Sequence, residues 1–232
     1  RGNKVSNESV EICQNKEKTK TMLSSKGVPV PEGREFKNLT DVERLVNYAE
    51  EIGYPIVLKP TNGSLGKGVY TNIQNGNALK ESFIDATSRY QYTDFIIEKF
   101  IPGTEYRVYV VEENVVGVIH RDPANVVGDG ISSVKELIKA KNKQRKENPY
   151  LASKLIKIDF EVEKFLKKKS LTVDSILEKG EKIYLRGKSN ISSGGEPIDK
   201  TDELPPKVKQ IAIDALKAMP SLPHAGVDII VD

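Results

Sequence analysis

Cysteine, histidine and tryptophan are scarce or missing in this 232-residue sequence, which has one Cys, two His and no Trp. Cys13 cannot form an internal disulfide, and with only His120 and His224 beside it the chain cannot complete a four-ligand Cys/His zinc site. Such sparing use of cysteine is typical of the reducing cytoplasm, and the sequence predicts a cytoplasmic protein.

Long apolar runs are also missing. Those that stand out, such as Val108-Tyr-Val-Val and Asp228-Ile-Ile-Val, are far shorter than the roughly 20 residues that a membrane-spanning helix needs. The charged N-terminal residues lack the apolar stretch of a signal peptide. The sequence therefore predicts a soluble protein without a membrane partner.

A strong excess of one charge is absent as well. Lys and Arg number 36 and Asp and Glu number 33, which gives a net charge of +3 and predicts no nucleic-acid partner. The basic run Lys164–Lys169 follows Glu161 and Glu163, and we interpret it as a solvated helix face. With 38% apolar and 30% charged residues, the chain is globular and long enough for one large domain or two subdomains.

Helical and strand-like patterns alternate along the sequence, which predicts an α+β fold. Helices are predicted over 15–26, 40–52, 75–90, 134–169 with a break at Pro149, and 208–219. Strands are predicted over 55–59, from Val69, and over 95–101, 105–111, 115–120, 182–186 and 226–232. Thr40-x-x-Glu43 predicts a capping box at the start of the second helix.

A glycine-rich stretch, Gly63-Ser64-Leu-Gly66-Lys67-Gly68, lies between two of these strands. Glycines let successive backbone N–H groups approach an anion, and Lys67 adds a charge. Lys59 ends the preceding strand, where it can reach a phosphate or lie along the sheet edge as a snorkelling side chain. The stretch lacks the Gly-Lys-Ser/Thr order of a Walker A loop. It predicts a flap over phosphates, with a plain turn as the alternative.

Carboxylates and arginines follow on later strands. Glu98 and Glu105 flank a Pro-Gly turn and can serve one ligand, although surface salt bridges explain them equally well. Asp228 lies in an apolar run, where a carboxylate is buried unless it faces a cleft, so we expect a metal or an arginine beside it. Arg107 and Arg121 lie on adjacent predicted strands, and each has a guanidinium group that can bind an anion.

In this order, these motifs resemble the ATP-grasp superfamily of carboxylate–amine ligases over about residues 15–232. The resemblance is carried by Asn15-Lys16-x-x-Thr19-Lys20, Gly27-Val-Pro-Val-Pro31, Val57-Leu-Lys59-Pro60, the 63–68 stretch, Glu98-x-Phe-Ile-Pro-Gly103-x-Glu105-Tyr-Arg107-Val and Gly226-Val-Asp228. Three further segments resemble the cyanophycin synthetases and the ligase domain of bifunctional glutathione synthetases: Arg121-x-Pro123-Ala-Asn125-Val-Val-Gly128-Asp129-Gly130, Leu171-Thr-Val-Asp174-Ser and Asn190-Ile-Ser-Ser-Gly194-Gly195-x-Pro-Ile-Asp199-x-Thr-Asp202.

The resemblance implies an ATP-grasp fold, in which two α+β subdomains clasp a nucleotide between two mainly antiparallel sheets. It divides the chain into a leading basic helical segment (1–26), a smaller subdomain with the glycine-rich lid (27–98) and a larger subdomain (99–232). The family's second metal-binding element, a Glu-x-Asn, is missing. We therefore expect the larger subdomain to be truncated and the natural chain to continue past Asp232.

The resemblance also assigns roles residue by residue. It implies ATP binding by Lys16, Lys59, Gly63, Ser64, Gly66, Lys67, Gly68, Glu98, Lys99, Phe100, Ile101 and Glu105. Among these, Lys16 and Lys59 are the phosphate-side or adenine-side lysines, the residues from Glu98 to Ile101 are the adenine hinge, and Glu105 is the ribose acceptor. Catalytic roles around the phosphate and the acyl phosphate fall to Arg107, Arg121, Arg186 and Asn190, and Asp228 is implied as a Mg²⁺ ligand.

The implied function is an ATP- and Mg²⁺-dependent ligase that activates an amino-acid or peptide carboxylate as an acyl phosphate and joins it to an amine. A nucleotide-binding module without ligase turnover is the alternative. Two departures concern substrate selection: His120 and Asp122 flank Arg121, and the segment around Arg186 lacks a second arginine. The expected partners are small-molecule amino acids or peptides, with a homodimer or a larger multidomain chain both left open.

Overall fold

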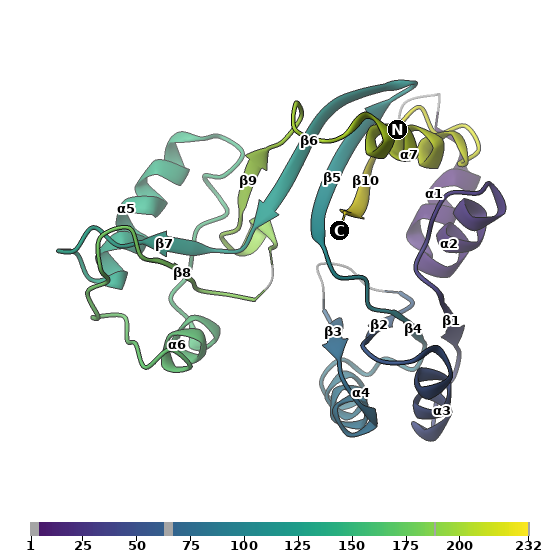
Figure 1. Cartoon of the computed structure of the whole chain (residues 1–232), viewed down its shortest axis with the longest axis horizontal. Coiled ribbons are helices and arrows are strands. Elements are labelled where there is room, and N and C mark those ends of the chain that lie inside the picture. Colours follow the sequence, from purple (N-terminus) through teal and green to yellow (C-terminus); the bar gives the residue numbers. More distant parts are fainter. Residues whose placement is uncertain (1–4, 63–66, 188, 232) are drawn as a thin grey trace. The chain divides into compact units, whose positions relative to one another are not determined.

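Helices and antiparallel sheets alternate along the chain, which confirms the α+β class. The computed structural model describes residues 5–62, 67–187 and 189–231 (Figure 1). The helices are α1 (Asn7–Gln14), α2 (Lys16–Ser25), α3 (Glu43–Ile52), α4 (Gly76–Tyr90), α5 (Val134–Glu147), α6 (Phe160–Lys167) and α7 (Pro206–Lys217), with a 3-10 turn at Ile191–Ser193. The strands are β1 (Gly33–Phe36), β2 (Ile56–Pro60), β3 (Tyr70–Ile73), β4 (Phe95–Lys99), β5 (Thr104–Val111), β6 (Asn114–Asp122), β7 (Asn125–Val127), β8 (Lys182–Tyr184), β9 (Glu196–Asp199) and β10 (His224–Val231).

The chain forms two compact units, one of residues 1–118 and 201–232 and one of residues 119–200. The boundary expected between residues 98 and 99 falls inside the first unit, and the three-part division of the sequence stays a prediction. Among the described residues, no helix combines the length and the apolar character needed to cross a membrane.

The first sheet of the first unit has the order β1-β4-β2-β3, with antiparallel pairings. Helices α3 and α4 lie side by side against one face of it (Figure 1). Successive strand residues face opposite sides, so Ile56 and Leu58 of β2 and Ile97 of β4 enter the core beneath these helices. The same alternation presents Lys59 and Glu98 on the other face of the sheet.

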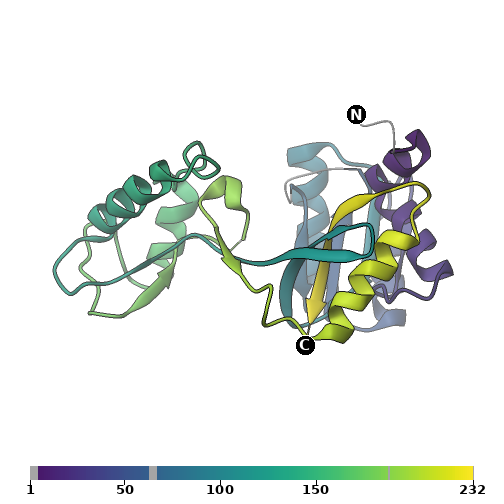
Figure 2. The ribbon, with the colours of Figure 1, turned by 90° about the horizontal axis from the view of Figure 1, so that it is seen from above.

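The second sheet has the order β10-β5-β6-β9, and α7 lies along β5 and β10 (Figure 2). Val108 and Val110 of β5 pack with Leu216 of α7 in a second core. Residues of β5 that alternate with these valines face away from α7. Arg107 is therefore on the open face, directly opposite Asp228 of β10.

The second unit contains its own core. The short β7–β8 sheet packs with α5 and α6 through Val126, Ile138, Val162, Leu166 and Ile183, all nearly inaccessible to solvent. The last residues of β6 pair with β9 in this unit. The structure thus gives residues 119–200 a separate apolar centre around which polar side chains are arranged.

Two sequence expectations are wrong. Thr40 does not cap α3: the cap position is Val42, without a side-chain bond, and the Asp41 carboxylate accepts from the Glu43 N–H instead. The run from Ile229 to Val231 is not a buried strand, because β10 is the last strand of the described sheet and Ile230 is 45% exposed. An edge strand covered on one face keeps only every second side chain from water.

Candidate active site

Two lysines of α2 reach the face of the first sheet that α3 and α4 leave uncovered. Lys16 and Lys20 are one helical turn apart, so their side chains leave the same face of α2. The Lys16 Nζ donates to the carbonyls of Pro60 (3.0 Å) and Thr61 (3.1 Å), and the Lys20 Nζ donates to the Gly33 carbonyl (2.7 Å). These bonds fix the Lys16 ammonium beside the end of β2 and the Lys20 ammonium beside the start of β1.

Lys59 and Glu98 form an ion pair on the same face. The Lys59 Nζ lies 2.5 Å from the Glu98 Oε1, and the two side chains are 21% and 10% exposed. The pair arises from the register of β2 and β4, which places Lys59 opposite Ile96 and Glu98 opposite Val57, so the two charged residues are diagonal neighbours. The sheet itself therefore brings together two residues that lie far apart in the sequence.

These side chains line one cavity of about 270 Å³. Its charged wall consists of Lys16, Lys20, Lys59 and Glu98, and its less polar wall consists of Cys13, Thr19, Leu23, Val30, Pro31 and Ile96. Three ammonium groups stand against one carboxylate. A cavity with this charge excess favours an anion, and its apolar wall suits the flat ring of a base.

Burial acts on the lysines of this cavity. Loss of hydration lowers the pKa of Lys16, and the nearby charge of Lys59 lowers it further, against a smaller opposing effect of Glu98. Burial likewise lowers the pKa of Lys20. Both shifts mean that the protonated ammonium groups are held at a cost that a bound anion would offset.

The glycine-rich stretch follows shortly after Lys59, which lines this cavity. Gly63, Ser64 and Gly66 lie outside the described residues. Lys67 is exposed, and Gly68 is buried with φ +65°, a conformation that favours glycine. Among the described residues, the buried Thr61 Oγ1 has no hydrogen-bond partner.

The predicted hinge after β4 is tied to its surroundings. The Lys99 Nζ donates to the carbonyls of Ile52 (3.0 Å) and Gly53 (2.7 Å), at the end of α3, and the Phe100 N–H donates to the Pro55 carbonyl. The Lys99 side chain is thus bound to the end of α3, and its main-chain N–H donates to the Glu32 carbonyl (2.8 Å). Ile101, the last of these residues, is 36% exposed.

A second polar group lies on the open face of β5 and β10. Arg107 donates to both carboxylate oxygens of Asp228, from Nε to Oδ1 (2.8 Å) and from Nη2 to Oδ2 (2.6 Å). Hydrogen bonding to Asp228 is the main reason that the pKa of Arg107 is raised. Glu105, two residues before Arg107, shares this face. The arginine expected beside Asp228 is therefore Arg107.

Asp228 is more exposed than the sequence predicts, with 44% of its side chain accessible. Among the described residues, no group of three or more His, Cys, Asp or Glu side chains could hold a metal ion. Asp228 thus offers one carboxylate of the kind that Mg²⁺ takes together with phosphate and water oxygens. Its role as a ligand stays a prediction.

The other predicted catalytic residues belong to the second unit. Arg186 is 6% exposed and donates to the carboxylates of Glu161 (2.5 Å) and Asp159 (2.6 Å) at the start of α6. Arg121 lies in β6 opposite Pro197 of β9. Asn190 begins the turn before β9, described below. The structure thus groups Lys16, Lys59 and Glu98 in one cavity and Arg107 with Asp228 in one ion pair.

Sequence reasoning missed Lys20 as a site residue of this cavity. The signal for Lys20 was present, because a lysine four positions after Lys16 on a helix must share its face.

The sequence matches a known domain family and is similar to known proteins. Residues 13–185 match the RimK-like ATP-grasp domain. The glutathione biosynthesis bifunctional protein GshAB of Clostridium perfringens is 37% identical over 225 residues, which are 95% of this chain and 28% of that protein. The cyanophycin synthetase of Crocosphaera subtropica is 35% identical over 223 residues, 95% of this chain and 25% of that protein.

Two solved structures are similar to this chain as well. A bifunctional glutathione synthetase from Pasteurella multocida is similar with a TM-score of 0.69 and 34% identity, over 98% of this chain and 30% of that one. The D-alanine–D-alanine ligase from Bacillus anthracis shares the fold, with a TM-score of 0.59 and 17% identity over 98% of this chain and 56% of that one. The chain spans less than a third of the length of the two curated relatives.

Proposed function

The chain belongs to the RimK-like ATP-grasp family, and from that premise we propose that it is the nucleotide-binding and catalytic part of an ATP-dependent ligase that joins a carboxylate to an amine. Similar proteins include one named as a bifunctional glutathione synthetase and one named as a cyanophycin synthetase, and the fold is shared with a D-alanine–D-alanine ligase. These names support the reaction class. The acid and the amine that this protein uses are left to experiment.

The observation that carries the proposal is the cavity of Lys16, Lys20 and Lys59 around Glu98. A triphosphate brings several negative charges, and three ammonium groups with one carboxylate leave two positive charges to meet them. Partial burial strengthens these interactions, because the local dielectric is lower than in water. We propose that ATP binds here, with its base against the apolar wall and its phosphates near the lysines.

The proposed reaction has two steps. A carboxylate is a poor electrophile, so one of its oxygens first attacks the terminal phosphorus of ATP, and ADP leaves with the electrons of the broken P–O bond. The amine then attacks the acyl carbon, loses a proton and expels inorganic phosphate, which leaves an amide. Phosphoryl transfer of this kind needs positioning and charge neutralisation more than covalent help.

The residues of the chain divide these tasks in the proposal. Lys16 and Lys59 hold the phosphates, and Glu105 accepts from the ribose hydroxyls. We propose that Arg107 and the second-unit residues Arg121, Arg186 and Asn190 stabilise the transferring phosphoryl group and the acyl phosphate. The stretch from Gly63 to Gly68 covers the phosphates and keeps water from the reactive intermediate.

Asp228 is the residue that would hold Mg²⁺. When bound, the ion neutralises phosphate charge, and its other ligands would come from phosphate and water oxygens. Asp228 would then exchange its bidentate contact with Arg107 for the ion. Arg107 would be released toward the same anionic ligand.

A nucleotide-binding module without turnover is the second candidate. It is favoured by the contact of Arg107 with both oxygens of the Asp228 carboxylate. Among the described residues, Asp228 belongs to no group of three or more His, Cys, Asp or Glu side chains that could hold a metal ion. Such a module would bind ATP in the lysine cavity and would not transfer its phosphate to an acid.

Phosphate release from ATP distinguishes the two candidates. We expect release across a panel of amino acids and dipeptides only when a suitable acid and an amine are present together, with one amide formed for each phosphate. ATP binding without release in any combination would support the module. Release that is independent of both substrates would point to a simple ATPase and contradict the ligase proposal.

A further inference from the structure

The residues from Asn190 to Gly195 form a tight turn in the second unit. The Asn190 carbonyl accepts from the N–H groups of Ser193 (3.0 Å) and Gly195 (3.1 Å). Gly194 has φ +101°, and a Cβ there would lie 2.6 Å from the Ile156 Cγ1. The turn therefore needs glycine for its backbone and for its close approach to Ile156. A turn packed this closely has little freedom to shift.

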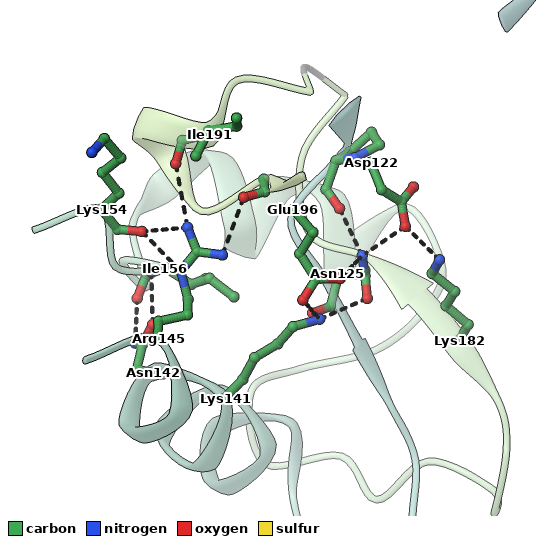
Figure 3. Close-up of polar contacts among 12 residues, drawn as sticks. Asp122, Asn125, Lys141, Asn142, Arg145, Lys154, Ile156, Lys182, Ile191 and Glu196 are labelled. Carbon is green, nitrogen blue, oxygen red and sulfur yellow. Dashed lines mark hydrogen bonds and ion pairs between the residues drawn. The ribbon is translucent and has the colours of Figure 1, made fainter. Parts of the chain in front are cut away.

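Arg145 of α5 binds this turn from beneath (Figure 3). Its Nη1 donates to the Gly195 carbonyl (3.1 Å), and its Nη2 donates to the carbonyls of Ile191 (3.3 Å) and Lys154 (2.7 Å). Its Nε donates to the Lys154 carbonyl as well (2.9 Å). One guanidinium thus ties the first residue of the 3-10 segment, Ile191, and Gly195 after that segment to the main chain at Lys154.

This arginine is buried in an unusual setting. The residue is 4% exposed, and its hydrogen-bond acceptors are carbonyl oxygens. Burial lowers the pKa of Arg145, and Glu196 opposes this effect through its charge. Burying a guanidinium without a hydrogen-bonded carboxylate is costly, and an apolar side chain would fill the space at less cost. The arginine supplies instead a planar set of donors that fixes several carbonyls at once.

A neighbour on α5 provides a comparison. The Asn142 side chain bonds both main-chain groups of Ile156, donating to its carbonyl (2.8 Å) and accepting from its N–H (2.8 Å) (Figure 3). Asn142 and Arg145 therefore hold the same segment, residues 154–156. Arg145 in addition bonds to the carbonyls of Ile191 and Gly195 in the Asn190 turn.

We infer that Arg145 is a positioning residue that fixes the turn from Asn190 to Gly195 and so places Asn190 for the acyl-phosphate step. The inference rests on the proposed function, in which Asn190 lines the acyl-phosphate region. Arg145 acts through the main chain of the turn. Its bonds to the turn go to main-chain carbonyls, and in the proposed function the Asn190 side chain is the group that meets the ligand.

The test compares Arg145→Lys with Asn142→Ala in the full chain. Lysine keeps the charge but has a single donor group, which cannot reach Lys154, Ile191 and Gly195 together. We expect Arg145→Lys to lower kcat for amide formation at least tenfold, with an unchanged Kd and stoichiometry for ATP by calorimetry. Asn142→Ala loosens the same segment and should leave kcat within about twofold. A purely structural role would change both variants alike, through the fraction of protein competent to bind.

A double-mutant cycle tests the route through Asn190. Asn190→Ala should lower kcat by itself, and Arg145→Lys should add no further loss in that background. Independent, multiplying losses would overturn the inference, as would a kcat for Arg145→Lys equal to that of Asn142→Ala. If the lysine variant does not fold, Arg145→Gln, which keeps an amide donor for the Lys154 carbonyl, takes its place. A wild-type chain that forms no amide refutes the proposed function itself, and the inference with it.

Discussion

At the scale of single residues, the cavity lined by Lys16, Lys20 and Lys59 predicts how one substitution changes ATP affinity. Lys59→Met removes one of its three ammonium groups and leaves Glu98 without its 2.5 Å partner. Since a hydrogen bond to a charged group contributes about 1.5–3 kcal/mol, we expect ATP affinity to fall roughly tenfold to a hundredfold by calorimetry. The matched control is Lys80→Met, because Lys80 pairs with Glu43 on the exposed surface. Equal ATP affinity in folded Lys59→Met protein and wild type would remove Lys59 from the site.

Glu105 is predicted to accept hydrogen bonds from the ribose hydroxyls of ATP. Glu105→Gln replaces a carboxylate that accepts from two hydroxyls with an amide that offers one acceptor oxygen. We expect the variant to bind ATP more weakly and to lose most of the wild-type preference for ATP over its 2′,3′-dideoxy analogue. Competition binding with both nucleotides measures this preference. A variant that still prefers the ribose as strongly as wild type would give Glu105 another role.

The lowered pKa values of Lys16 and Lys20 predict a pH dependence. Bound phosphate favours the ammonium forms, so ATP binding should take up protons on the alkaline side, and affinity should fall as pH rises through the lowered values, before the ordinary lysine value of 10.5. In the same range these two lysines bind more protons in the unfolded chain than in the folded one, so their contribution to stability without nucleotide should rise with pH. Calorimetry in two buffers of different ionisation enthalpy measures the proton uptake, and Lys20→Met should reduce it. Binding without proton uptake at any alkaline pH would contradict the assignment.

At the scale of elements, long segments with a periodic apolar pattern are predictable from the sequence. Short strands, and the pairing of one strand with another, are not. The helix predicted over 75–90 is found at Gly76–Tyr90, because its apolar spacing and its Asn75 cap act locally. Strands β1, β7 and β9 are three or four residues long, too short to show an alternating pattern, and α1 was not predicted either. The pairing of Arg107 with Asp228 joins residues 121 positions apart. The sequence indicated a metal or an arginine beside Asp228, and only the register of β5 and β10 identifies Arg107.

The link between β4 and β5 gives the prediction at this scale. Gly103 has φ +141°, and a Cβ there would lie 2.5 Å from the Val231 carbonyl oxygen of β10. Gly103→Ala should therefore lower the free energy of unfolding by about 1–3 kcal/mol, since strand β10 or the link must move. Gly117→Ala is the control, because nothing lies within 4 Å of its Cβ position, and we expect a change within about 0.5 kcal/mol. Urea unfolding of both variants decides, and equal stabilities would show that the link tolerates a side chain.

At the scale of the whole molecule, the order of motifs was sufficient to identify the family. The roles of the individual lysines, acidic residues and arginines stay predictions, and how they are grouped was not predictable from the sequence. The lysine cavity forms only when α2 packs on the sheet, which no local pattern encodes. This packing brings Lys20 into the cavity. Arg186 is bound to Asp159 and Glu161 within the second unit, a partner choice set by the fold of residues 119–200.

The central claim is that a carboxylate is activated as an acyl phosphate, and isotope transfer tests it most directly. The acid that supports phosphate release is supplied with both carboxylate oxygens as ¹⁸O, together with ATP and the amine. One of these oxygens attacks phosphorus and remains there when the amine displaces phosphate. The account predicts one ¹⁸O in each inorganic phosphate and one in each amide, by mass spectrometry. Unlabelled phosphate formed alongside the amide would contradict it.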